Sequence, residues 1–223
     1  MYQCCIFDLD GTLANTLPSI AYFGNAALKK YGFHPIETDR YRYLVGTGAH
    51  DLVKFMLAEH GCHDEQIFQK VYECYNQTYE NNFLYLTEPY AGIPELLQEL
   101  QKREFRLGIL SNKPQSTAQK VAEGLFGKNC FQICYGKREG FPLKPNPSVL
   151  LAMLDAWGIS KENCLYIGDT SVDMQTAQNA NVTSVGVLWG FRDRTELEEN
   201  NAAHIVSAPQ EIITVIDTSK SAK

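Results

Sequence analysis

The stretch Cys4-Cys5-Ile6-Phe7-Asp8-Leu9-Asp10-Gly11-Thr12 lies near the start of the 223-residue chain and joins an apolar run to two carboxylates. A short continuous apolar run is typical of a buried parallel strand. Residues i and i+2 of an extended chain share a face, so Asp8 and Asp10 can approach one reacting centre. Gly11 allows the chain to turn sharply where the strand ends. Taken alone, this pattern could also be a simple turn or a calcium-type loop.

Three further apolar runs resemble the first and predict strands over residues 106–110, 164–167 and 182–188. Residues 131–134 and 204–206 are weaker strand candidates. Helical spacing of apolar residues predicts helices over residues 93–102, 147–157 and 173–180. Strands that alternate with helices predict an α/β fold, with a doubly wound, Rossmann-like parallel sheet as its core.

Residues 15–85 break this alternation of strands and helices. Their sequence predicts three or four helices, including residues 17–31, 50–60 and 64–82. We expect residues 15–85 to form a helical cap over the strand ends, and residues 1–14 and 86–223 to form the catalytic core. The polar tail, residues 217–223, is expected to be frayed.

The composition is that of an ordinary globular protein, with 44% hydrophobic and 21% charged residues. A net charge of -6 argues against binding to nucleic acid or anionic membranes through bulk charge. No apolar run approaches the roughly 20 residues needed to span a bilayer. The seven cysteines have neither CxxC nor zinc-finger spacing, which favours free thiols in a reducing cytosol. We therefore expect a cytoplasmic protein that binds neither nucleic acid nor a membrane.

A second carboxylate pair lies in Gly168-Asp169-Thr170-Ser171-Val172-Asp173, which follows a predicted strand and opens a predicted helix. Asp169 and Asp173 are four residues apart, so a helix can direct both to one side. Helix capping is the alternative, but it explains one carboxylate better than two. Four carboxylates at two strand ends need a cation to coexist, and hard oxygen ligands in this number suit Mg²⁺.

Two weaker signals follow other predicted elements. Ser111 and Asn112 end the strand that begins at Arg106, although such a pair is also common in turns and helix N-caps. Lys144 lies in Lys144-Pro145-Asn146-Pro147, ahead of a predicted helix. By itself it fits a surface lysine beside a proline helix start equally well.

As an ordered set, these motifs resemble those of the haloacid dehalogenase superfamily. The set comprises DxDGT at residues 8–12, the hydroxyl of Ser111, Lys144, and GDTxxD at residues 168–173. The helical insert resembles the C1-type cap of that family. The chain is most similar to the phosphoglycolate phosphatase-like branch, which shares LVGTG at residues 44–48, LSNK at 110–113 and KPNP at 144–147.

The resemblance implies a role for each motif residue. Asp8 would be the nucleophile that forms an aspartyl-phosphate, and Asp10 would serve as general acid and then general base. The Asp8 carboxylate, the Asp10 carbonyl and Asp169 would hold Mg²⁺, with Asp173 as a further ligand or a brace. Lys144 would be catalytic by neutralising charge beside Asp8. The residues expected to bind substrate are Thr12, Ser111, Asn112, Lys144 and Gly48.

The implied function is Mg²⁺-dependent hydrolysis of a small phosphorylated metabolite, such as phosphoglycolate, by a monomer or homodimer. Asp10 argues against a dehalogenase, which needs no acid at that position. Ile20 replaces the histidine expected in a β-phosphoglucomutase-like member. A pyrophosphatase, a nucleotide or sugar phosphatase, and a non-catalytic binding protein remain the alternatives. The candidate cations for a substrate carboxylate are Arg40, Arg42, His50, Lys54, Lys137 and Arg138.

Overall fold

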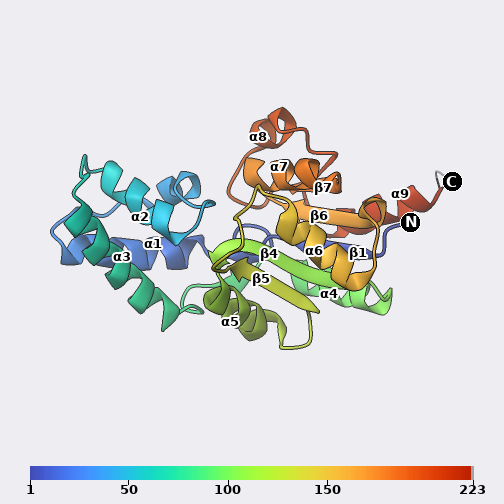
Figure 1. Cartoon of the computed structure of the whole chain (residues 1–223), viewed down its shortest axis with the longest axis horizontal. Coiled ribbons are helices and arrows are strands. Elements are labelled where there is room, and N and C mark those ends of the chain that lie inside the picture. The colour runs from blue at the N-terminus through green and yellow to red at the C-terminus, as the bar shows by residue number, and fades with distance from the viewer. Residues whose placement is uncertain (222–223) are drawn as a thin grey trace.

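A six-stranded parallel sheet forms the centre of the computed structural model, which describes residues 1–221 (Figure 1). The strand order is β5-β4-β1-β6-β7-β8. The strands are β1 (Cys4–Phe7), β4 (Arg106–Pro114), β5 (Ile133–Lys137), β6 (Cys164–Gly168), β7 (Thr183–Val187) and β8 (His204–Val206). This confirms the predicted α/β class and its parallel sheet.

Both faces of the sheet are covered by helices, as expected for a doubly wound fold. Along β1, Cys5 and Phe7 pack into one hydrophobic cluster, and Cys4 and Ile6 pack into another on the opposite face. The first cluster includes apolar residues of α4 (Ile93–Lys102), α5 (Gln115–Phe126) and α9 (Gln210–Ser221). The second includes residues of α6 (Ser148–Trp157) and α7 (Ser171–Ala180). The continuous apolar runs of the sequence thus reflect strands that are buried on both sides.

Strand β1 lies at the topological switch point of the sheet. From β1 the chain builds β4 and β5 on one side, and then β6, β7 and β8 on the other. Connections leave β1 in opposite directions, so a crevice opens beyond the carboxyl ends of β1 and its two neighbours. The polar residues at positions 8 and 169, which follow β1 and β6, and residue 111 near the end of β4 therefore meet at one edge.

Helices α1 (Leu17–Lys30), α2 (Ala49–Ala58) and α3 (Glu65–Glu80) pack on one another to one side of the sheet (Figure 1). With the short 3₁₀ helix η1 (Thr38–Tyr43), they surround their own hydrophobic cluster, which includes the fully buried Tyr41 and Met56. An antiparallel ribbon of β2 (Ala14–Asn15) and β3 (Glu88–Pro89) connects these helices to the sheet. Phe191, from the loop between β7 and α8 (Arg194–Glu199), packs into the same cluster.

Several elements differ from the sequence-based expectation. Helix α5 and helix α8 were not predicted, and β5 begins two residues later than the expected strand. The prediction of a frayed tail from residue 217 is wrong up to Ser221, because α9 continues and buries Ile212 and Ile216. Residues 222–223 of that prediction lie outside the described residues. Within residues 1–221, no helix is both long and apolar enough to cross a membrane.

Candidate active site

Asp8 and Asp169 follow the adjacent strands β1 and β6 at the carboxyl edge of the sheet. The backbone N–H of Asp8 donates to the carbonyl of Ile167 at 2.8 Å, which continues the pairing of the two strands. Gly11 turns the chain with a φ of 87°. A Cβ at this position would lie 2.3 Å from Asp169 Oδ2, so only glycine permits this approach.

Three buried carboxylates form a cluster that can hold a metal ion. Asp8, Asp169 and Asp173 each offer an oxygen, and these oxygens lie within 4.8 Å of one another. Burial raises the pKa of Asp8 to about 6, against the opposing charge of Lys144 and with smaller contributions from the charges of Asp173 and Asp10. Burial, and then the charges of Asp173 and Asp8, raise the pKa of Asp169 well above its ordinary value. A divalent cation would relieve this repulsion, and hard oxygen ligands fit Mg²⁺.

Asp173 already has hydrogen-bond donors on both of its carboxylate oxygens. Oδ1 accepts from Lys144 Nζ at 2.8 Å and from the Tyr166 hydroxyl at 3.2 Å. Oδ2 accepts from the backbone N–H of Thr170 at 3.1 Å and from its hydroxyl at 2.8 Å, which caps α7. A carboxylate with four donors is better suited to orienting its neighbours than to binding a metal directly.

Lys144 lies between Asp8, the candidate nucleophile, and Asp173. Its Nζ lies 2.9 Å from Asp8 Oδ1 and 2.8 Å from Asp173 Oδ1, and its side chain is 2% exposed. Burial alone would lower the pKa of Lys144, but the charges of Asp173 and Asp8 outweigh it and raise that pKa well above its ordinary value. The ammonium therefore stays charged beside Asp8.

Asn112 holds the Lys144 loop and the turn before α2 together. Its side chain accepts from the backbone N–H of Lys144 at 2.9 Å and donates to the Lys144 carbonyl at 3.2 Å. It also donates to the Gly46 carbonyl at 3.0 Å. Ser111 precedes it at the same strand end and lines the pocket beside Asp8.

Asp10 forms an ion pair with Lys113, a residue that the sequence did not indicate as functional. Lys113 Nζ donates to both Asp10 oxygens, at 2.9 and 3.0 Å, and to the Tyr79 hydroxyl at 2.8 Å. Tyr79 belongs to α3, so this contact joins the helical insert to the sheet. Burial raises the pKa of Tyr79 well above its ordinary value, so its hydroxyl keeps its proton.

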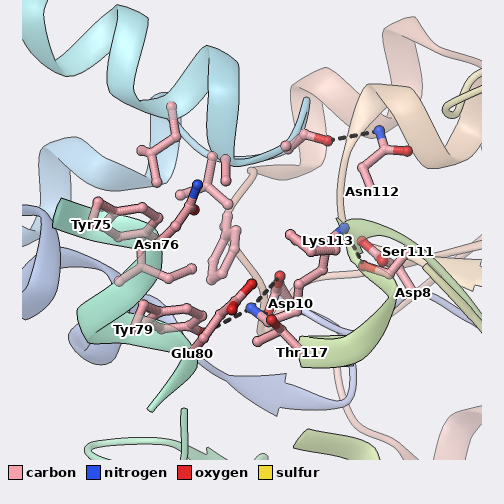
Figure 2. Close-up of a pocket in the computed structure, with 18 of the residues that line it drawn as sticks. Asp8, Asp10, Tyr75, Asn76, Tyr79, Glu80, Ser111, Asn112, Lys113 and Thr117 are labelled. Atoms are coloured by element: carbon pink, nitrogen blue, oxygen red, sulfur yellow. Dashed lines mark hydrogen bonds and ion pairs between the residues drawn. The ribbon is translucent and has the colours of Figure 1, made fainter. Parts of the chain in front are cut away.

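A pocket of about 640 Å³, measured out to its open mouth, lies between the helical insert and the strand ends. Figure 2 shows Tyr75, Tyr79 and Glu80 projecting from α3 toward Asp10 and Lys113. The insert also contributes Ile20, Val45, Gly46, Gly48, Ala49, Leu52 and Asn76. The sheet side contributes Asp8, Asp10, Ser111, Asn112, Lys113, Pro114, Thr117, Thr170 and Phe191. A mostly apolar and aromatic wall thus faces a polar floor.

Residues 5–187 match the family model of the haloacid dehalogenase-like hydrolases. The chain belongs to this family. A phosphoglycolate phosphatase from Rhodobacter capsulatus is 33% identical over 86% of this chain and 87% of its own length. An N-acetylmuramic acid 6-phosphate phosphatase from Pseudomonas aeruginosa is 29% identical over 96% of this chain and 95% of its own.

A solved structure shows the same architecture. It is that of a protein from Lactobacillus delbrueckii subsp. bulgaricus assigned as a phosphoglycolate phosphatase. The TM-score is 0.88 at 26% identity, over 95% of this chain and 96% of the other. Together with the family match, these relatives identify the chain as a phosphoric monoester hydrolase.

The structure gathers most of the motif residues of this haloacid dehalogenase-like hydrolase at one point. Asp8, Asp10, Ser111, Asn112 and Gly48 line the pocket. Lys144, Asp169 and Asp173 lie immediately around Asp8. Thr12, one of the residues expected to bind substrate, lies outside the pocket lining and donates its hydroxyl to Asp169 Oδ1 at 2.8 Å.

The six cations considered for a substrate carboxylate do not line the pocket. Arg40 pairs with Glu59 at 2.7 Å, and Arg42 donates to the Gly190 carbonyl at 2.8 Å. Arg138 lies over the rings of Tyr135 and Phe141. The other three cations, His50, Lys54 and Lys137, also lie outside the pocket lining. Lys113 lies in the pocket instead, and its place in LSNK, directly after Ser111 and Asn112, was the signal that could have revealed it.

Proposed function

We propose that this phosphatase hydrolyses the phosphate ester of a small metabolite through an aspartyl-phosphate on Asp8, with Mg²⁺ as its cofactor. The observation that carries the proposal is the position of Asp8. It lines the pocket and lies beside the buried Lys144 and the carboxylate of Asp169. Phosphoglycolate is the first candidate substrate, since it is named for relatives such as the Rhodobacter capsulatus enzyme. Pyrophosphate, nucleotides and sugar phosphates remain candidates within the same mechanism.

The residues present fit a magnesium ion. The carboxylates of Asp8 and Asp169 and the backbone carbonyl of Asp10 would hold it, with Asp173 as a brace. When bound, the ion neutralises charge on the phosphoryl oxygens. It would also offset the repulsion that raises the pKa of Asp8 and Asp169.

The protein groups would then divide the chemistry in two steps. Asp8 attacks phosphorus in line, and its oxygen forms a bond to phosphorus as the ester oxygen leaves with a proton from Asp10. In the second step Asp10 takes a proton from water, which attacks the acyl phosphate and frees Asp8. Lys144 and Ser111 would stabilise the negative charge on the transferring phosphoryl group throughout.

We propose that residues 15–85 act as a cap and residues 1–14 and 86–223 as the catalytic core. Two observations support this division. The α1–α3 helices surround a hydrophobic cluster to which the other part contributes Phe191, and the β2–β3 ribbon joins the two parts within residues 1–221. Closure of such a cap would exclude water and strengthen electrostatic contacts in the pocket.

We place the enzyme in the cytoplasm, as a monomer or homodimer. All seven cysteines carry free thiols, which suits a reducing compartment.

A substrate panel tests the proposed function. The wild-type enzyme should hydrolyse at least one small phosphate monoester with Mg²⁺, and EDTA should abolish turnover. The panel should contain phosphoglycolate, N-acetylmuramate 6-phosphate, pyrophosphate, nucleotides and sugar phosphates. The absence of phosphate release from every member, and from p-nitrophenyl phosphate, would contradict the proposal and favour a non-catalytic binding protein.

A further inference from the structure

The pocket offers one position at which a cationic side chain could bind a second anionic group of a substrate, in addition to its phosphate. Among the described residues that line the pocket, Lys113 carries the only cationic side chain, whereas Asp8, Asp10 and Glu80 are acidic. Glu80 is exposed, so solvent screens its charge. Lys113 has a side chain only 4% exposed, so its charge acts in a less polar surrounding.

The partners of Lys113 leave a hydrogen-bond donor free beside it. Its ammonium has three N–H groups, and Asp10 Oδ1, Asp10 Oδ2 and the Tyr79 oxygen accept them at 2.8–3.0 Å. The Tyr79 hydroxyl therefore acts as an acceptor toward Lys113. No hydrogen bond within the described part of the chain uses the proton of that hydroxyl. A protonated, buried phenol beside an ammonium is a strong donor pair for an anion.

The position of Lys113 fits an anion close to the ester oxygen. A general acid at Asp10 would lie about 2.6–3.2 Å from that oxygen. Lys113 Nζ lies 2.9 Å from Asp10 Oδ1, so it would be on the order of 5 Å from the ester oxygen. A carboxylate attached through a single carbon to the ester oxygen would extend about half that distance, leaving roughly one hydrogen-bond length to Nζ.

We propose that Lys113 and Tyr79 form the subsite for a carboxylate on the leaving group. The substrate class is then the phosphate esters of 2-hydroxy carboxylic acids, of which phosphoglycolate is the smallest. The substrate carboxylate replaces one Asp10 oxygen as an acceptor of Lys113 and receives the Tyr79 hydroxyl proton as a hydrogen bond. This assignment rests on the proposed phosphatase function and adds its specificity residues, one from strand β4 and one from helix α3.

A competing role for Lys113 is to position Asp10 alone. In that case the lysine would help every substrate that needs a protonated leaving group, with or without a carboxylate. The two roles are separated by comparing phosphoglycolate with 2-hydroxyethyl phosphate, which has the same chain length and a neutral hydroxyl in place of the carboxylate.

The test measures kcat/KM for both esters in the Mg²⁺-loaded enzyme and in the variants Lys113→Gln and Tyr79→Phe. We expect the wild type to prefer phosphoglycolate. Lys113→Gln should lower the preference ratio by about tenfold to a hundredfold, as expected for one or two charge-assisted hydrogen bonds. Tyr79→Phe keeps the ring and should lower the ratio by about threefold to tenfold. Lys120→Gln, a change at an exposed lysine of α5, should leave the ratio unchanged.

Each outcome supports or overturns the subsite. An equal loss on both esters in Lys113→Gln would show that the lysine only positions Asp10. If the wild type hydrolyses both esters equally well, the subsite is overturned and the proposed phosphatase function stands. If it hydrolyses neither these esters nor any other phosphate monoester, the proposed function itself is overturned. If Lys113→Gln does not fold, as judged by thermal unfolding, the ratio in Tyr79→Phe decides alone.

Discussion

At the scale of single residues, Asp8 combines two properties that normally oppose each other. A nucleophilic carboxylate must be ionised, yet burial penalises its charge. Lys144, at 2.9 Å, offsets that penalty, and a metal ion held by Asp169 would do so in the same place. The site therefore depends on charge balance as much as on shape.

Replacement of the proposed nucleophile should abolish turnover. Asp8→Asn keeps the size of the side chain but removes the charged oxygen that would attack phosphorus. We expect kcat to fall at least about a thousandfold, the scale seen when a nucleophile is deleted. Steady-state assays on a substrate of the panel measure this. Retention of more than about a tenth of the wild-type activity in a clean preparation would rule out the covalent mechanism.

The loss of activity on replacing the proposed general acid should depend on the leaving group. Asp10→Asn should slow turnover by about 10²–10⁴-fold and still permit Mg²⁺ binding through the backbone carbonyl. The loss should be smaller for p-nitrophenyl phosphate, whose leaving group needs little protonation, than for an alkyl phosphate. Equal losses on both would contradict the acid role.

Magnesium affinity should fall in acid. The pKa of Asp8 is raised to about 6 in the metal-free protein, and a protonated carboxyl offers the metal no anionic oxygen. Lowering the pH through 6 therefore makes protons compete with Mg²⁺, while raising it above 7 leaves the carboxylate ionised. We expect the Kd for Mg²⁺, measured by calorimetry, to be at least about tenfold larger at pH 5 than at pH 7.5. The same Kd at both values would contradict this.

At the scale of elements, the junction between β6 and α7 positions Asp173, which contacts Lys144. A Cβ on Gly168 would lie 2.3 Å from the Cβ of Asp173, so the first turn of α7 can approach the strand only because residue 168 is glycine. The hydroxyl and backbone N–H of Thr170 then fix Asp173 against Lys144. The strand-to-helix turn thus orients a lysine from a distant loop.

Filling this junction should disturb both stability and activity. Gly168→Ala should cost about 1–3 kcal/mol by overpacking, or roughly 2–12 °C in Tm. It should also lower kcat, because Asp173 and with it Lys144 would shift. Gly158→Ala is the matched control: its φ is 64°, but its Cβ would meet no atom within 4 Å. The control should lose some stability and keep kcat; an equal loss of kcat in both variants would contradict the role of the junction.

The elements also show what could be predicted from the sequence. Continuous apolar runs predicted β1, β4, β6 and β7, because strands buried on both faces leave little room for polar residues. Helix α5 was missed: its apolar positions are mostly Ala118, Val121 and Ala122, and Gly124 interrupts it. The motif spacing predicted the carboxylate cluster. It could not predict the contact between Lys113 and Tyr79, since that contact depends on how α3 lies over β4.

At the scale of the whole molecule, the pocket exists only where the helical insert meets the sheet. The insert supplies its aromatic wall, while the sheet supplies the charged floor around Asp8. In the proposed mechanism, the insert would select the substrate and the sheet would supply the chemistry. We expect any closing motion of the insert to hinge at the β2–β3 ribbon, which joins the insert to the sheet.

The turn before α2 should affect substrate selection without affecting the metal. Gly48 has a φ of 102°, and a Cβ there would lie 3.2 Å from the Asn112 carbonyl, at the contact between insert and sheet. Gly48→Val should therefore press the insert away from β4 and reorder kcat/KM among several phosphate esters. Magnesium Kd and activity on p-nitrophenyl phosphate, a small unnatural ester, should stay comparatively intact, because Asp8 and Asp169 are untouched.

A second glycine of the insert provides a control that distinguishes an effect on substrate selection from an effect on stability. Gly61 also has a positive φ, of 65°, but its Cβ would meet no atom within 4 Å and it lies outside the pocket lining. Gly61→Val should thus strain the backbone and lower Tm without changing the order of substrates. The comparison requires kcat/KM for each ester beside Tm for each variant. A loss in Gly48→Val that is uniform across substrates and tracks Tm, as in Gly61→Val, would refute the role of the turn in selection and leave the chemistry at Asp8 standing.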